Sequence, residues 1–151
     1  MLQETSYLDW NNSIEILNKA HDADLFVLII GPKGTGKTTL VRDFAKRKSK
    51  KLVSINFSLR TRESHLVGTK TLTEGSVGFD EGILIKSMKE GSMLYLDEIN
   101  SSEPDVLLRL DEALDDRRQI VLKESAGEVI YANKDWFVVA TINPLTHVGT
   151  K

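Results

Sequence analysis

The chain has 151 residues, which is the size of one ordinary domain and is enough to bury a hydrophobic core without disulfides or metal. Hydrophobic residues make up 40% of it and charged residues 28%, as is typical of soluble globular proteins. The formal net charge of −2 argues against a dominant electrostatic attraction to nucleic acid or to anionic membranes.

The sequence also argues against cysteine-dependent sites, a secretory signal and a membrane span. The chain has no cysteine, which rules out disulfides, thiolate zinc sites and cysteine nucleophiles and fits a reducing cytoplasm. The first residues lack a basic region followed by an apolar run, so no signal peptide is expected. The longest apolar run, residues 25–30, is far shorter than the roughly 20 residues of a membrane helix. We therefore expect a cytoplasmic protein without a membrane span.

The hydrophobic pattern in the first third of the chain predicts two helices and two strands. An apolar stripe at helical spacing follows a candidate cap at Asp9, and its members are Trp10, Ile14, Leu17 and His21. Residues 25–30 form a continuous apolar run, which is typical of a strand buried on both faces. A helix is predicted over residues 38–48, and a second strand over residues 52–56.

The rest of the chain continues this alternation. A helix is predicted over residues 82–90, a strand over residues 93–96 and a last strand over residues 136–142. Residues 69–79 and 120–131 each contain two short extended pieces around a turn, so both are predicted to be inserted β-hairpins. Strands that alternate with helices predict an α/β fold with a mostly parallel sheet.

One more helix is predicted to start near Ser102. This side chain is a candidate cap, Pro104 suits the first turn, and Asp105 suits the positive end of the helix dipole. The apolar stripe of this helix is predicted to contain Val106, Leu107, Leu110, Ala113 and Leu114.

Residues 31–38 match the phosphate-binding motif G-x-x-x-x-G-K-[ST] in full, between a predicted strand and a predicted helix. Glycines let the backbone N–H groups converge on phosphate oxygens, and the helix N-terminus adds its dipole. Lys37 is expected to reach the β- and γ-phosphates, Thr38 to bind Mg²⁺, and Lys33 to point to solvent. The predicted nucleotide-binding residues are Gly31, Pro32, Lys33, Gly34, Thr35, Gly36, Lys37, Thr38 and Thr39. A glycine-rich turn without a ligand is disfavoured by the flanking elements and by a second motif.

That second motif is a pair of acids, Asp97 and Glu98, at the end of an apolar strand. Asp97 is predicted to hold Mg²⁺ through water, and Glu98 to act as the general base that activates the attacking water. Asn143 ends the last predicted strand, and its neutral amide is predicted to orient the same water. The alternative for Asn143, a cap of the turn before Pro144, is disfavoured by the order of the three motifs.

Together these motifs resemble those of AAA+ ATPases, specifically the MoxR-like, dynein-related group that includes the gas-vesicle ATPase and the midasin modules. The resemblance covers the chain from about Phe26 onward. Beyond the phosphate-binding motif it rests on residues 78–84, 96–100, 104–107, 110–114, 127–130 and 140–144. The string Asp-Glu-Ile-Asn before a helix start is the most specific of them.

The resemblance implies a P-loop NTPase (AAA+) fold with a three-layer core and two inserted hairpins that face a pore and a substrate. It implies that ATP and Mg²⁺ bind between the subunits of a homo-oligomeric ring, usually a hexamer. Hydrolysis would then remodel a protein client or load a metal cofactor. By position, Lys37 and Thr38 correspond to the Walker A motif, Asp97 and Glu98 to Walker B, and Asn143 to sensor 1.

The family pattern continues beyond sensor 1 with an arginine-finger region, a fifth strand and a helical lid. We therefore interpret residues 1–151 as a single large, nucleotide-binding subdomain that lacks the C-terminal helical lid and is incomplete at its C-terminus. The fifth strand would pair with residues 25–30, so this edge is predicted to be unpaired and prone to association. Arg117 and Arg118 are candidates for the finger, although surface arginines at a helix end are the preferred interpretation.

Three functions fit this pattern. The leading one is an ATP-hydrolysing motor, the second a nucleotide-binding interaction module with little hydrolysis, and the third a nucleic-acid-directed motor, which the net acidity disfavours. The basic residues 46–51 are interpreted as a solvated helix end, so nucleic acid is not expected as a partner. Trp136 is interpreted as core packing, and Glu124 and Glu128 as solvated residues near a turn.

Overall fold

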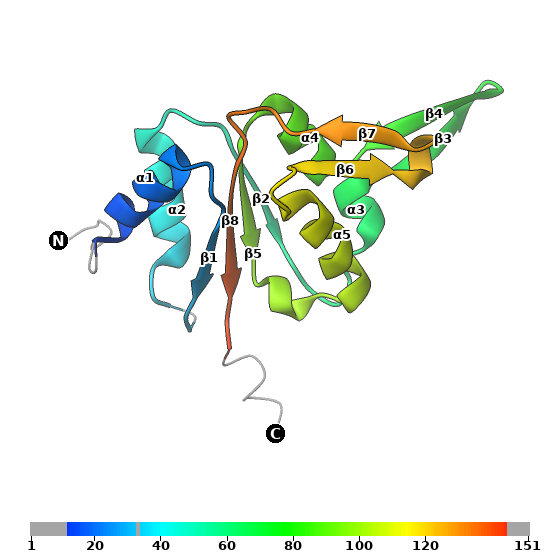
Figure 1. The fold of residues 1–151 in the computed structure, drawn as a ribbon. Helices are drawn as coiled ribbons and strands as arrows, with labels where there is room; N and C mark the ends of the chain where they lie inside the picture. Colours follow the sequence, from blue (N-terminus) through cyan, green and yellow to red (C-terminus); the bar gives the residue numbers. More distant parts are fainter. Residues whose placement is uncertain (1–11, 33, 145–151) are drawn as a thin grey trace.

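A four-stranded parallel sheet, with strand order β1-β8-β5-β2, lies at the centre of the fold (Figure 1). This computed structural model describes residues 12–32 and 34–144. The strands are β1 (Val27–Ile30), β2 (Leu52–Asn56), β5 (Met93–Asp97) and β8 (Phe137–Ile142). The predicted parallel α/β sheet is therefore confirmed. All four strands run in the same direction, so their carboxyl ends meet at one edge of the sheet.

Helices cover both faces of this sheet and form the three layers that were predicted (Figure 1). One face carries α1 (Ser13–Asp22) and α2 (Lys37–Arg47), and the other carries α3 (Glu63–Val67), α4 (Ile83–Glu90) and α5 (Pro104–Leu114).

Side chains along β5 point alternately to the two faces of the sheet, so this strand packs against both helical layers. Met93 and Tyr95 pack toward α1 and α2, whereas Leu94 and Leu96 pack toward the other helices. Each fully buried large apolar side chain of these two cores contributes about 1.5–3 kcal/mol to folding.

Two antiparallel hairpins extend from the α3–α5 side of the sheet, as predicted (Figure 1). The first consists of β3 (Gly68–Thr73) and β4 (Ser76–Glu81), joined by Glu74 and Gly75. Both turn residues have a left-handed backbone, with φ values of 49° and 82°, which matches the twist of a two-residue hairpin turn. The second consists of β6 (Gln119–Leu122) and β7 (Glu128–Tyr131), joined through the 3₁₀ turn η3 (Lys123–Ser125).

The first predicted strand is shorter and more exposed than the sequence indicates. The expectation that residues 25–30 are buried on both faces is wrong, because β1 lies at the edge of the sheet and its residues are alternately half-buried and exposed. Val27 and Ile29 pack on the α1–α2 core, whereas Leu28 is 50% and Ile30 65% exposed. Within the described residues, β1 pairs with β8 alone, so its other edge has no partner strand, as predicted.

The start of α5 also differs from its prediction. Glu103, not Ser102, is the N-cap residue, while Pro104 occupies the first turn as expected. Ser102 Oγ instead donates a 2.8 Å hydrogen bond to the carbonyl of Ile99, which closes the 3₁₀ turn η2 (Ile99–Ser101) ahead of the helix. The cap predicted at Asp9, and Trp10, lie outside the described residues.

The predicted apolar stripe of α5 is buried at three of its five positions and partly exposed at the other two. Val106, Leu110 and Ala113 are buried, while Leu107 and Leu114 are only partly covered. Arg109 is buried as well, at 6% exposure, although no apolar pattern includes it.

The open edge of β1 leads to a first testable prediction. We expect the 151-residue chain to self-associate at high concentration, because an unpaired apolar strand edge is a template for pairing. Leu28→Lys should shift the mass measured by light scattering toward the monomer. Ile16→Lys, on the exposed face of α1, is the matched control, since Ile16 is 55% exposed and lies on a helix. A wild-type chain that remains a monodisperse monomer would contradict the prediction.

Candidate functional site

The loop between β1 and α2 provides the base of the candidate site. Gly34 and Gly36 have φ values of 83° and 85°, a left-handed conformation that glycine adopts without strain. Gly36 is the N-cap residue of α2, and no side chain in the described part of the chain forms a cap hydrogen bond there. The first N–H groups of α2, with the positive end of its dipole, are thus suited to bind an anion.

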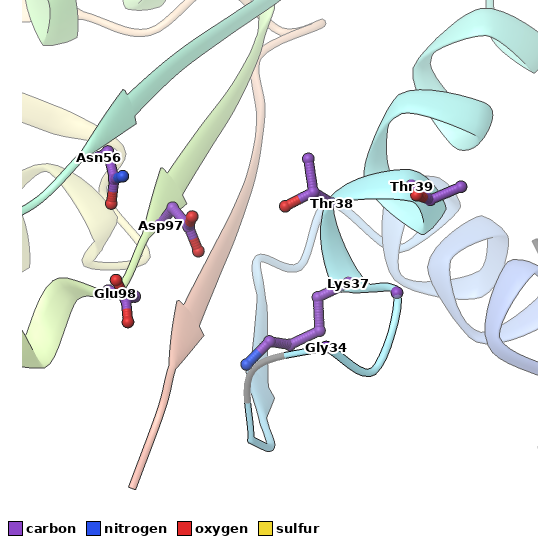
Figure 2. Close-up of a pocket in the computed structure, with 8 residues that line it drawn as sticks. Gly34, Lys37, Thr38, Thr39, Asn56, Asp97 and Glu98 are labelled. Atoms are coloured by element: carbon purple, nitrogen blue, oxygen red, sulfur yellow. The ribbon is translucent and has the colours of Figure 1, made fainter. Parts of the chain in front are cut away.

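The side chain of Lys37 lies over this loop (Figure 2). Its Nζ donates a hydrogen bond to the carbonyl of Gly31. Thr35 Oγ1 donates to the carbonyl of Pro32 over 3.0 Å, which stabilises the loop from within. Lys33, which was predicted to point to solvent, lies outside the described residues.

A pocket of about 410 Å³ opens between this loop and the carboxyl ends of β2 and β5 (Figure 2). Thr38 and Lys37 approach it from one side, and Asp97 and Glu98 from the other. Its lining residues are Gly34, Gly36, Lys37, Thr38, Thr39, Asn56, Asp97 and Glu98. The structure therefore brings the two predicted motifs together across one cavity of a size typical for ligand sites.

Hydroxyl groups connect the two motifs at the wall of the pocket. Tyr95 OH donates to Asp97 Oδ1 over 3.2 Å and lies 3.1 Å from Thr38 Oγ1. Thr141 Oγ1 donates to the same carboxylate oxygen over 2.6 Å. Burial raises the pKa of the Tyr95 hydroxyl, so this group keeps its proton at neutral pH.

Glu98 has a left-handed backbone, with φ 56° and ψ 54°, directly after β5. This conformation costs a non-glycine residue on the order of 1–3 kcal/mol and is frequent at functional sites. It is held by a 2.9 Å hydrogen bond from the Glu98 N–H to Thr141 Oγ1. The turn explains how two adjacent acids, Asp97 and Glu98, present their carboxylates in different directions.

Asn143 lies beside Glu98, as the order of the motifs predicts. Its Nδ2 is 3.5 Å from Glu98 Oε1, the long limit of a hydrogen bond, and the residue is buried. Asn100 binds it on both sides of the backbone, donating to its carbonyl over 3.2 Å and accepting from its N–H over 3.4 Å. That Asn143 orients water stays a prediction.

Three polar residues of the site were missed in the sequence. Asn56 lines the pocket and pairs in register with Asp97, since β2 and β5 are neighbours. Its position as the polar end of an apolar strand was a usable signal. Tyr95 and Thr141 gave no such signal, because a lone hydroxyl within an apolar strand is compatible with ordinary core packing.

The oxygen atoms at the pocket fit Mg²⁺. This ion is usually held by one or two protein oxygens together with substrate phosphates and water, and Thr38 and Asp97 offer a hydroxyl and a carboxylate. The described residues contain no group of three or more His, Cys, Asp or Glu side chains placed to hold a metal alone. Such a closed cage is not needed for the chemistry of a phosphate-bound ion.

The two candidate arginines differ in their surroundings. Arg118 donates to the carbonyl of Trp136 over 2.6 Å, and its guanidinium lies 4.9 Å from the ring centroid of Phe26. Arg117 is exposed and pairs with Asp115 across 3.3 Å. Trp136 is itself buried, which confirms its interpretation as core packing. Of the two arginines, Arg117 is exposed and Arg118 is partly buried.

None of the helices among residues 12–32 and 34–144 combines the length and the apolar composition needed to cross a membrane. Among the basic residues 46–51, contacts within the chain are made by Arg47, Lys50 and Lys51. Arg47 pairs with Asp43 over 3.0 Å and Lys51 with Glu90 over 3.2 Å. Burial lowers the pKa of Lys50, whose Nζ donates to the carbonyl of Asp135. The side chains of Arg47 and Lys51 remain 61% and 66% exposed, which agrees with the predicted solvated helix end.

Comparison with known proteins agrees with this geometry. Residues 26–151 match the family model of the AAA domain, dynein-related subfamily. Uncharacterized proteins of Staphylococcus aureus strains USA300 and NCTC 8325 are each 36% identical over 148 residues, which is 93% of this chain and 56% of theirs. The chain thus spans little more than half the length of these curated relatives.

The crystal structure of a proposed ATPase from Cytophaga hutchinsonii superimposes with a TM-score of 0.67 at 22% sequence identity. The alignment covers 91% of this chain and 39% of that one. At this identity the likeness concerns the fold, and it supports the P-loop AAA+ architecture described above.

Proposed function

This chain belongs to the dynein-related subfamily of AAA domains, and from that membership we propose that it binds ATP with Mg²⁺ and hydrolyses ATP to ADP and phosphate. One observation carries the proposal. The phosphate-binding loop and the acids at the end of β5 line the same pocket, with the Asn143 amide beside Glu98. A glycine-rich turn without a ligand would not require these three motifs to converge.

Each side chain has a proposed task. Lys37 and the N–H groups of α2 bind the phosphates. Thr38 and Asp97 would hold Mg²⁺, which neutralises charge that develops on the phosphate oxygens. Glu98 accepts the proton of the water that attacks the γ-phosphorus, and Asn143 orients that water without competing for its proton.

We further propose that the domain works in a homo-oligomeric ring, as AAA proteins often do, and that ATP hydrolysis remodels a protein client. Arg117 is the better candidate for an arginine that reaches a neighbouring nucleotide, because it is exposed, whereas Arg118 is partly buried and donates to the carbonyl of Trp136. The β3–β4 hairpin is a candidate client contact. Leu72 and Val77 face each other near its tip and are 74% and 75% exposed.

A binding experiment tests whether Lys37 binds the phosphates of MgATP. We expect Lys37→Ala to weaken MgATP binding by roughly 10- to 100-fold, since a hydrogen bond to a charged group contributes about 1.5–3 kcal/mol. Titration calorimetry on the full chain measures this. Lys19→Ala is the matched control, because Lys19 is exposed on α1 and does not line the pocket. Equal MgATP affinity in wild type and Lys37→Ala would contradict the assigned phosphate site.

Turnover at different protein concentrations separates a motor from a nucleotide-binding interaction module. A ring that completes its sites with a neighbouring arginine gains specific activity as it assembles. A binding module keeps a negligible rate at every concentration. ATPase rate per chain, measured beside mass by light scattering, distinguishes the two.

A further inference from the structure

Tyr95 occupies an unusual position between the two motifs of the pocket. It lies on β5 two residues before Asp97, so both side chains point to the same face of the sheet. Its ring is buried against the α1–α2 core and only 3% of the residue is exposed. The hydroxyl nevertheless reaches both Asp97 Oδ1 and Thr38 Oγ1, at 3.2 and 3.1 Å. A phenylalanine would fill the same apolar space without these contacts.

The directions of these hydrogen bonds follow from the chemistry of the groups. A phenol has one proton, and Tyr95 donates it to the carboxylate of Asp97, the stronger acceptor. In the contact between Tyr95 and Thr38, the threonine hydroxyl must therefore be the donor. With its proton committed to Tyr95, Thr38 Oγ1 keeps lone pairs that are free to bind a cation.

Asp97 is fixed in a complementary way. The hydroxyls of Tyr95 and Thr141 both donate to Oδ1, at 3.2 and 2.6 Å. Two charge-assisted hydrogen bonds on one oxygen hold the plane of the carboxylate and leave Oδ2 for other ligands. Groups that bind a metal ligand from behind in this way fix its orientation, and their loss typically weakens metal affinity by about 10- to 100-fold.

We propose that Tyr95 is a positioning residue for Mg²⁺, which links Thr38 of the phosphate loop to Asp97 of β5 and sets both oxygens before the metal–nucleotide complex binds. The inference rests on the proposed MgATP function. Tyr95 itself touches neither nucleotide nor metal in this proposal and acts through the two residues that do.

The variant Tyr95→Phe, in the full chain, keeps the buried ring and removes only the hydroxyl. Affinity for a fluorescent ATP analogue is measured with excess EDTA and across a Mg²⁺ titration. We expect metal-free affinity to stay within about twofold of wild type, because the phosphate loop is intact. The Mg²⁺ concentration for half-maximal effect should rise by about tenfold or more. Tyr131→Phe, which removes an exposed hydroxyl on β7, is the matched control and should match wild type in both measurements.

The outcomes separate the inference from the function on which it rests. A wild-type chain that binds no analogue with or without Mg²⁺ would overturn the proposed function and the inference with it. A wild type that responds to Mg²⁺ beside a Tyr95→Phe variant with the same response would overturn the inference alone. Equal loss of metal-free and metal-dependent binding would assign Tyr95 a structural role, also against the inference. A thermal melt of the variant checks that the fold is retained.

Discussion

Replacing Glu98 with glutamine is expected to reduce ATP hydrolysis by about 10²- to 10⁴-fold while ATP binding stays close to wild type. The amide cannot take a proton from water, but its oxygen still accepts the hydrogen bond that Asn143 Nδ2 donates to Glu98 Oε1. The substitution therefore removes the base while keeping this hydrogen bond. Phosphate release under saturating MgATP measures the rate, and calorimetry on the same sample measures binding.

Glu103→Gln is the control for this variant. Glu103 is an exposed carboxylate at the start of α5 whose side chain makes no cap hydrogen bond, so its amide should leave hydrolysis and binding unchanged. Turnover retained in Glu98→Gln would remove Glu98 as the general base. Loss of binding in Glu98→Gln would instead show that the carboxylate is needed for nucleotide binding as well as for turnover.

The parts of the fold that could be predicted are those encoded locally. Residues 31–38 specify their loop because glycines permit its left-handed turns and a helix follows directly. The hairpin at Glu74 and Gly75 likewise depends on two turn residues between short extended segments. Asp97 was predicted from its motif, and the parallel sheet brings it to this loop because its strands end at a common edge.

The errors arose where the environment of a segment is set by distant parts of the chain. An apolar run such as residues 25–30 does not reveal whether it becomes a central or an edge strand, because strand order depends on pairing with β8. Serine is a common N-cap residue, but the hydroxyl of Ser102 donates to the carbonyl of Ile99 in the turn η2 instead of capping α5. The link from Tyr95 to Thr38 joins residues far apart in sequence and is visible only once the sheet is assembled.

The contacts of Arg109 are another feature that depends on distant segments and was not predicted. The interpretation of Glu124 as solvated is wrong, because Glu124 Oε1 accepts a 2.9 Å hydrogen bond from Arg109 Nη2. Glu112 Oε1 accepts from Nη1 over 3.0 Å, and Glu63 Oε2 lies 2.8 Å from Nε. Nη1 also donates to the carbonyl of Val121 over 3.0 Å. A single buried guanidinium thus joins α3, α5 and the hairpin of β6 and β7, with carboxylates from three separate segments.

Arg109→Met is therefore expected to lower the free energy of unfolding by about 3 kcal/mol. Breaking a buried ion pair from one side typically costs 3–5 kcal/mol, because the charges left behind lose their partner. The lower end applies here, since the carboxylates of Glu63, Glu112 and Glu124 remain 30–40% exposed to water. Urea unfolding followed by circular dichroism measures the change.

The control for this prediction is Arg60→Met, at an exposed arginine in the loop before α3, which should change the free energy by less than about 0.5 kcal/mol. A loss under about 1 kcal/mol in Arg109→Met would mean that water screens the cluster as it screens surface pairs.

Because Arg109 connects α3, which leads directly into β3, to the base of the second hairpin, its loss should also affect both hairpins together. Amide hydrogen exchange in Arg109→Met should then quicken in β3–β4 and β6–β7 before it quickens in β5 and β8. Exchange that quickens in one hairpin alone would show that the two hairpins are stabilised separately.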